Sequence, residues 1–240
     1  MPLKKKVILL FDLDGVLVRP GGYRTASRDT LLYFIEQMGV EVNLPGEDGL
    51  SQYEAITITN EWDMVPLTLA IILDIIYQEA GISPKQANLR QSLDAIQGSG
   101  LKRMQVDYLS AINKFPALIK PHITPSPAAL SGCVGNQAGD LFNFIPPMVL
   151  SELLGNTRDV RRSPTTRIFQ QLILGSETFT RVYGLQAEIQ SGSYLQAMDR
   201  PLLTPVSRDF LRGGMREERF YCAGLTLRPS LPPVQNKNGN

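Results

Sequence analysis

Two aspartates near the start of the chain, Asp12 and Asp14, are the residues whose type and spacing best fit chemistry. Side chains alternate along an extended segment, so the single intervening residue sends both carboxylates to the same side. Two like charges held this close need a counter-charge, and a divalent cation such as Mg²⁺ commonly supplies it. An isolated Asp-x-Asp is most often a solvated turn, so the pair by itself indicates a divalent-metal site only together with the residues around it.

The segment around the pair indicates how it is positioned. The aliphatic run Val7-Ile8-Leu9-Leu10 precedes it and Gly15 follows it. An unbroken run of this kind is typical of a strand buried on both faces. Because an unpaired charge is costly inside such a strand, we expect Asp12 and Asp14 at its C-terminal end. Open α/β sheets bind their ligands at that end.

Composition bounds the class of protein. The chain has 240 residues, of which 43% are hydrophobic and 20% charged, as in ordinary globular proteins. Its formal net charge of +1 gives no reason to expect a nucleic acid or an anionic membrane as a partner. Cys133 and Cys222 are far apart and show no metal-ligand spacing, which favours a reducing cytoplasm. The apolar run after Lys4-Lys5-Lys6 is too short for a signal sequence, and residues 67–77 contain Asp74 and fall short of a membrane span.

Helical signals dominate between residues 19 and 215. Residues 67–80 are apolar nearly all round, as in a helix buried inside a helical domain. Ser83-Pro84 and Ser163-Pro164 each place proline after an N-cap residue, so both predict helix starts. Residues 147–154 predict a short helix. Apolar residues at helical spacing also precede Gly39, a C-terminal cap, in a helix that we expect to begin near Ser27: Leu31, Phe34, Ile35 and Met38.

A second strand is expected near the end of the chain. The run Phe220-Tyr221-Cys222-Ala223-Gly224-Leu225 is strand-like and is followed by Thr226. Together with the hydrophobic strand and Asp12-Leu13-Asp14-Gly15-Val16-Leu17, this pattern resembles the haloacid dehalogenase (HAD) superfamily. The first motif of that family is a hydrophobic strand followed by Asp-x-Asp-Gly-[Thr/Val]-Leu. Its second motif is a hydrophobic strand that closes in Ser or Thr.

The resemblance implies a role for each matching residue. Asp12 would be the nucleophile that forms an aspartyl-phosphate, and Asp14 would be the general acid and base. Both would bind Mg²⁺, Asp14 through its backbone carbonyl. Thr226 would hydrogen-bond the transferring phosphoryl group. Because dehalogenating members lack an acid at the position of Asp14, the resemblance favours a Mg²⁺-dependent phosphatase that acts on a small phosphorylated metabolite.

The resemblance also implies an architecture. The fold class would be α/β, with a Rossmann-like parallel core that is incomplete in this chain and a large, mainly helical cap inserted between the two motif strands. Residues 1–18 and 216–240 would form the parts of the core, and residues 19–215 the cap. A cap that closes over the site would exclude water and select the substrate. Neither the identity of the substrate nor the oligomeric state follows from the sequence.

The family's third and fourth motifs have no counterpart. Neither Asp nor Glu follows Glu218, and Lys237 lies in a polar tail. Three explanations are open: an N-terminal portion of a longer enzyme, which we favour, a chain completed by a second polypeptide, or a catalytically inactive HAD relative that serves as a binding or interaction module. A glycosyltransferase-type Asp-x-Asp is disfavoured, because only eleven residues precede Asp12 where a nucleotide-binding region would lie.

The remaining candidates carry weaker signals. Arg24 closes the Pro- and Gly-rich segment 19–24, which predicts a loop, and could meet a phosphate, although an exposed loop arginine is more often solvated. His122 is the only histidine and has no paired carboxylate motif, so a structural role is favoured. Arg158, Arg161 and Arg162 form a basic cluster that could bind a phosphate or an acidic partner, although a solvated helix entrance is favoured.

Overall fold

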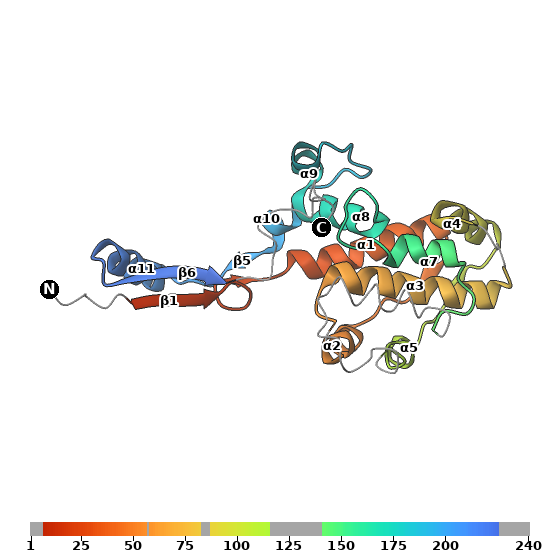
Figure 1. Ribbon diagram of the computed structural model, residues 1–240, viewed down its shortest axis with the longest axis horizontal. Helices are drawn as coiled ribbons and strands as arrows, with labels where there is room; N and C mark the ends of the chain where they lie inside the picture. Colours follow the sequence, from red (N-terminus) through yellow and green to blue (C-terminus); the bar gives the residue numbers. More distant parts are fainter. Residues whose placement is uncertain (1–6, 57, 83–86, 116–140, 226–240) are drawn as a thin grey trace.

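The structure is a computed structural model that describes residues 7–56, 58–82, 87–115 and 141–225. The fold is mixed α/β, with short strand pairs and mostly helices. The molecule is elongated, with a small strand-and-helix unit at one end and a helical body at the other (Figure 1). The chain passes between the two parts twice, and the two passages are joined by a short antiparallel pair, β2 (Val18–Arg19) with β5 (Arg200–Pro201).

The small unit is built on two strands from opposite ends of the described chain. β1 (Val7–Asp12) and β6 (Phe220–Leu225) pair in parallel along their whole length, from Val7 opposite Phe220 to Asp12 opposite Leu225. The expectation that these two strands lie side by side in a parallel sheet is therefore confirmed. α11 (Pro205–Arg216) packs on the face that carries Phe220, whose ring lies 5.8 Å from that of Phe210.

The prediction that the first strand is buried on both faces is wrong. Val7, Ile8 and Leu10 are 51%, 63% and 60% exposed. The cause is the size of the sheet: among the described residues only β6 flanks β1, and α11 packs against only one face of the pair. An aliphatic run can thus predict a strand correctly without determining how many layers cover it.

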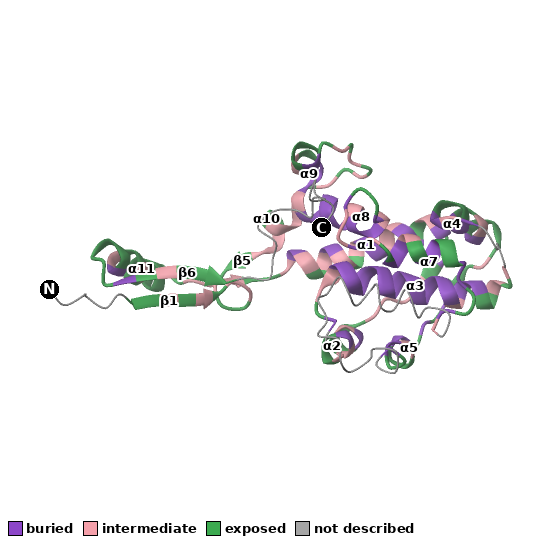
Figure 2. Cartoon of the chain, in the orientation of Figure 1, coloured by how far each residue is buried: buried purple, intermediate pink, exposed green. Residues whose placement is uncertain are grey.

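The helical body contains the main hydrophobic core. α1 (Gly22–Met38) and α3 (Glu61–Ala80) run through it, and α3 is buried on nearly every side, as its apolar composition predicts (Figure 2). Two-residue strands β3 (Glu41–Val42) and β4 (Arg103–Met104) pair in parallel at its edge. The other described helices of the body are α2 (Glu47–Ala55), α4 (Leu89–Gly98), α5 (Tyr108–Ile112), α7 (Pro147–Leu154), α8 (Pro164–Leu174), α9 (Ser176–Tyr183) and α10 (Tyr194–Met198).

Capping residues explain where several helices begin. The hydroxyl of Ser163 accepts a hydrogen bond from the backbone of Thr166, so the predicted start of α8 is confirmed. The helix predicted from Ser83-Pro84 instead begins at Leu89, because Asn88 and Gln91 form a capping box; residues 83–86 are outside the described part.

Two other helix starts were predicted too late. The first helix begins at Gly22 rather than near Ser27, and α3 begins at Glu61, where the side chain of Asn60 caps it. Pro66 lies inside α3 without ending it. No helix within the described ranges is long and apolar enough to cross a membrane.

Candidate carboxylate site at the strand ends

Asp12 occupies the carboxyl end of the parallel pair. It is the last residue of β1, lies opposite Leu225 at the end of β6, and is exposed. The backbone ladder continues one residue further, since the Leu13 N–H donates to the Leu225 carbonyl at 2.9 Å. Asp12 is therefore held in fixed register at the sheet edge where parallel α/β sheets bind ligands.

A tight turn follows and carries Asp14. The amides of Leu17 and Val18 donate to the Leu13 carbonyl at 3.0 and 2.8 Å, and the Gly15 N–H donates to the Val18 carbonyl at 2.8 Å. Gly15 has φ +81° and open space where a Cβ would be, so its backbone conformation, not crowding, is what favours glycine. The turn keeps Asp14, which is half-buried, directly beyond the end of β1.

The chemistry of Asp12 and Asp14 is compatible with Mg²⁺, which prefers oxygen ligands. Mg²⁺ is commonly bound through one or two carboxylates, with water and substrate phosphates completing its shell. Among the described residues no group of three or more His, Cys, Asp or Glu side chains forms a closed cage. A Mg²⁺ ion at this edge would be held by the Asp12 carboxylate and the Asp14 backbone carbonyl. Thr226, the predicted phosphoryl contact, is outside the described residues, as is His122.

Asp199 anchors the start of α1, a contact that the sequence analysis missed. Its Oδ1 accepts hydrogen bonds from the backbone N–H groups of Gly21 and Gly22, both at 2.9 Å, and so ties the start of α1 to the returning chain. A Cβ on Gly21 would lie 2.9 Å from the Met198 carbonyl oxygen, so the close approach requires glycine. A separation of 178 residues between Asp199 and Gly21 leaves no local signal for this contact.

The basic cluster divides into one structural arginine, Arg158, and two exposed arginines, Arg161 and Arg162, which lie just before α8 as expected for a solvated helix entrance. Arg158 pairs with the buried Asp63, with Nη2 2.6 Å from Oδ2. Arg161 donates to the Tyr183 carbonyl at 3.0 Å. The Arg162 Nε lies 3.6 Å from Oδ2 of Asp159. Each guanidinium thus has a partner within the helical body.

Comparison with known proteins shows the fold alone. No protein-family model matches the chain, and no curated protein sequence does. A structural-genomics target of the Northeast Structural Genomics Consortium, solved by X-ray crystallography, is similar in fold, with a TM-score of 0.60 at 14% sequence identity. The similarity covers 94% of this chain and 63% of that one, so the chain spans less than two thirds of its structural neighbour.

Proposed function

We propose that the chain carries the phosphoryl-transfer site of a HAD-like, Mg²⁺-dependent phosphatase that acts on a small phosphorylated metabolite. One observation supports this above all: the parallel register of β1 and β6 puts Asp12 at the carboxyl edge of two adjacent strands, and a glycine turn puts Asp14 directly beyond it. Thr226 follows β6 in sequence and would supply the second motif.

The proposed reaction has two steps. A carboxylate oxygen of Asp12 attacks phosphorus and the P–O bond to the leaving group breaks, while Asp14 gives the leaving oxygen its proton. Water then attacks phosphorus with Asp14 as the base, the P–O bond to Asp12 breaks, and phosphate leaves. When bound, Mg²⁺ would offset the charge on the phosphoryl oxygens.

The same proposal assigns residues 19–215 mainly to a helical cap over a core formed by residues 1–18 and 216–240, with α11 at the end of the first range packed on β6 and so belonging with the core. Its support is the shape of the chain, in which the helical body is inserted between β1 and β6 and joined to them by two short passages (Figure 1). A body attached in this way can cover the exposed Asp12 when substrate binds and exclude water from the reaction.

The experiment is hydrolysis of para-nitrophenyl phosphate by the 240-residue chain with and without Mg²⁺. Asp12→Asn is expected to abolish turnover, because an amide cannot replace the nucleophile, and Asp14→Asn to slow it by about 10²–10⁴-fold. Asp209→Asn is the matched control, since Asp209 lies in the same small unit with a side chain 74% exposed and is expected to leave the rate unchanged.

Binding of the metal is tested separately by thermal unfolding. Mg²⁺ is expected to raise the unfolding temperature of the parent chain and of Asp209→Asn, and to raise that of Asp12→Asn less. A parent chain without activity that Mg²⁺ does not stabilise would sink the phosphatase assignment and favour a non-catalytic binding module. Full turnover by Asp12→Asn would exclude Asp12 as the nucleophile.

A further inference from the structure

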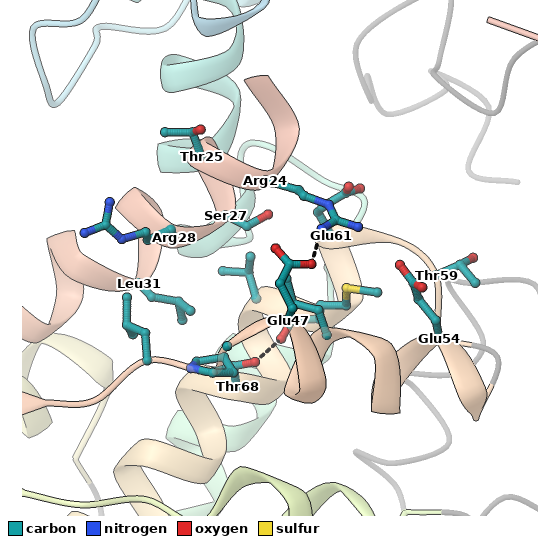
Figure 3. A pocket seen from close by; sticks show the side chains of 16 residues that line it. Arg24, Thr25, Ser27, Arg28, Leu31, Glu47, Glu54, Thr59, Glu61 and Thr68 are labelled. Carbon is teal, nitrogen blue, oxygen red and sulfur yellow. Dashed lines mark hydrogen bonds and ion pairs between the residues drawn. The ribbon is translucent and has the colours of Figure 1, made fainter. Parts of the chain in front are cut away.

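A second candidate site lies inside the helical body, away from the strand ends. A cavity of about 530 Å³ opens between α1, α2 and the first turns of α3 (Figure 3). Pockets for small organic ligands typically enclose about 300–1,000 Å³, so this one has room for a metabolite. Its apolar lining includes Leu31, Met64 and Val65, which are only 4%, 7% and 2% exposed.

The charged residues around the cavity come from three helices. α1 contributes Arg24 and Arg28, α2 contributes Glu47 and Glu54, and α3 contributes Glu61. Figure 3 shows Arg24, Glu47 and Glu61 gathered at one side of the cavity. The cavity thus combines an apolar interior with side chains of both charges.

One ion pair at the cavity joins α1 to α2. The Arg24 guanidinium, on α1, contacts the carboxylate of Glu47, on α2. The two side chains are 55% and 75% exposed, and ion pairs this exposed contribute little to stability. A ligand that offers each partner a replacement charge can therefore separate them at small cost, and bidentate arginine–carboxylate contacts are among the stronger polar contacts available to it.

We propose that this cavity binds a small amino-acid-like zwitterion with an apolar side chain. The ligand carboxylate lies against Arg24 and its ammonium group against Glu47, so the two charges that now meet each other each gain a partner on the ligand. The Arg24 guanidinium and the Glu47 carboxylate lie next to each other in the protein. In an α-amino acid a single carbon carries both the ammonium and the carboxylate group, so the ligand fits between the two side chains. The apolar side chain then covers Leu31, Met64 and Val65.

The preference for a zwitterion follows from the balance of charge. A simple cation can bind Glu47 only by replacing Arg24, and a simple anion can bind Arg24 only by replacing Glu47, so neither adds an ion pair, whereas a zwitterion replaces one pair with two. Glu47 and Glu61 also lie in the first turns of their helices, where acidic groups are favourable without any ligand. That role does not account for Arg24 or for the apolar cavity behind it. The proposal is independent of the phosphatase assignment and uses none of its residues.

The test is calorimetric titration of the full chain with L-leucine, L-methionine and L-phenylalanine. At least one is expected to bind, and 2-phenylethylamine and 3-phenylpropionate, which each lack one charge, are expected to bind at least about tenfold more weakly than L-phenylalanine. Arg24→Met and Glu47→Gln are each expected to weaken binding at least about tenfold. Arg90→Met is the matched control, because Arg90 forms an exposed ion pair with Asp94 on α4, remote from the cavity, and should leave affinity unchanged.

A cavity-filling variant guards against loss of fold in the charge variants. Leu50 lines the cavity and is half-buried, so Leu50→Trp is expected to abolish binding while the chain keeps its far-UV circular dichroism spectrum. No binding by any of the three amino acids up to about 10 mM overturns the proposal. So does affinity that is unaffected by Leu50→Trp or Arg24→Met. Equal binding of 2-phenylethylamine and L-phenylalanine identifies a site for organic cations and overturns the assignment of a zwitterion.

Discussion

The buried ion pair between Asp63 and Arg158 predicts an unequal response to the loss of its two members. Asp63 lies in the first turn of α3 with a side chain 1% exposed, whereas the Arg158 side chain is 24% exposed. The pair is bidentate, with Nη2 2.6 Å from Oδ2 and Nη1 3.2 Å from Oδ1. The Thr157 hydroxyl also donates to Oδ1 at 3.2 Å, and the guanidinium carbon lies 5.1 Å from the centre of the Trp62 ring.

The loss of unfolding free energy in each variant depends on which charged side chain remains without its partner. Arg158→Met leaves a fully buried carboxylate without its cation, a change that costs about 3–5 kcal/mol of unfolding free energy. Asp63→Asn leaves a guanidinium that already reaches solvent and keeps hydrogen-bonding groups nearby, so its cost is about 1–3 kcal/mol. Because the two residues contact each other, the double variant Asp63→Asn/Arg158→Met is expected to lose less stability than the sum of the two single changes.

Urea unfolding of the three variants and the parent chain, followed by tryptophan fluorescence and circular dichroism, measures these differences. Arg90→Met, which removes an exposed ion pair with Asp94, is the control and should change stability by less than about 0.5 kcal/mol. Equal losses from Arg158→Met and Asp63→Asn, or losses as small as that of the control, would refute the argument that burial of the carboxylate sets the cost.

Two further predictions concern α11 and a tyrosine of the helical body. A Cβ on Gly214 would lie 2.2 Å from Cζ of Phe220, so Gly214→Ala should lower stability by about 1–3 kcal/mol and speed amide exchange in β6. A Cβ on Gly213 would meet nothing within 4 Å, so Gly213→Ala should stabilise the chain by up to about 1 kcal/mol. Loss from both variants alike would contradict this. Burial, followed by a hydrogen bond to Asp29, raises the pKa of Tyr194 from 10.0 to about 12. Because the folded chain holds this phenol proton more tightly, the resulting stability is complete below pH 10 and is lost as pH rises towards about 12. Tyr194→Phe should therefore flatten the plot of stability against pH in this alkaline range. A plot of unchanged steepness would contradict the raised pKa of Tyr194.

Several features of the fold could be predicted because their signals are local. Ser163 followed by proline predicts the start of α8, since an N-cap hydroxyl and its amide partner are three residues apart. The aliphatic runs predict β1 and β6, and their parallel pairing followed from a resemblance between motifs. Helix starts were less accurate where the cap was a residue that the prediction had not considered, as with Asn88 and Asn60.

The candidate sites were predictable to different degrees. Asp12 and Asp14 could be identified because their spacing, the strand before them and the glycine after them are contiguous in the sequence. The roles of Arg24 and Arg158 could not, because the partners Glu47 and Asp63 lie 23 and 95 residues away. An arginine in a loop has the same local signature whether it is solvated, paired or aimed at a ligand.

The sequence by itself determined the strands β1 and β6, the helices α1, α3, α7 and α8, and that two carboxylates follow a strand. Only the tertiary structure decided that β1 is largely exposed, that Asp199 binds the amides that open α1, and that three helices enclose a cavity lined by both apolar and charged side chains. The physical reason is the distance along the chain over which each signal acts. Periodicity and capping act over a few residues, whereas burial, ion pairing and cavity shape depend on which distant segments come into contact.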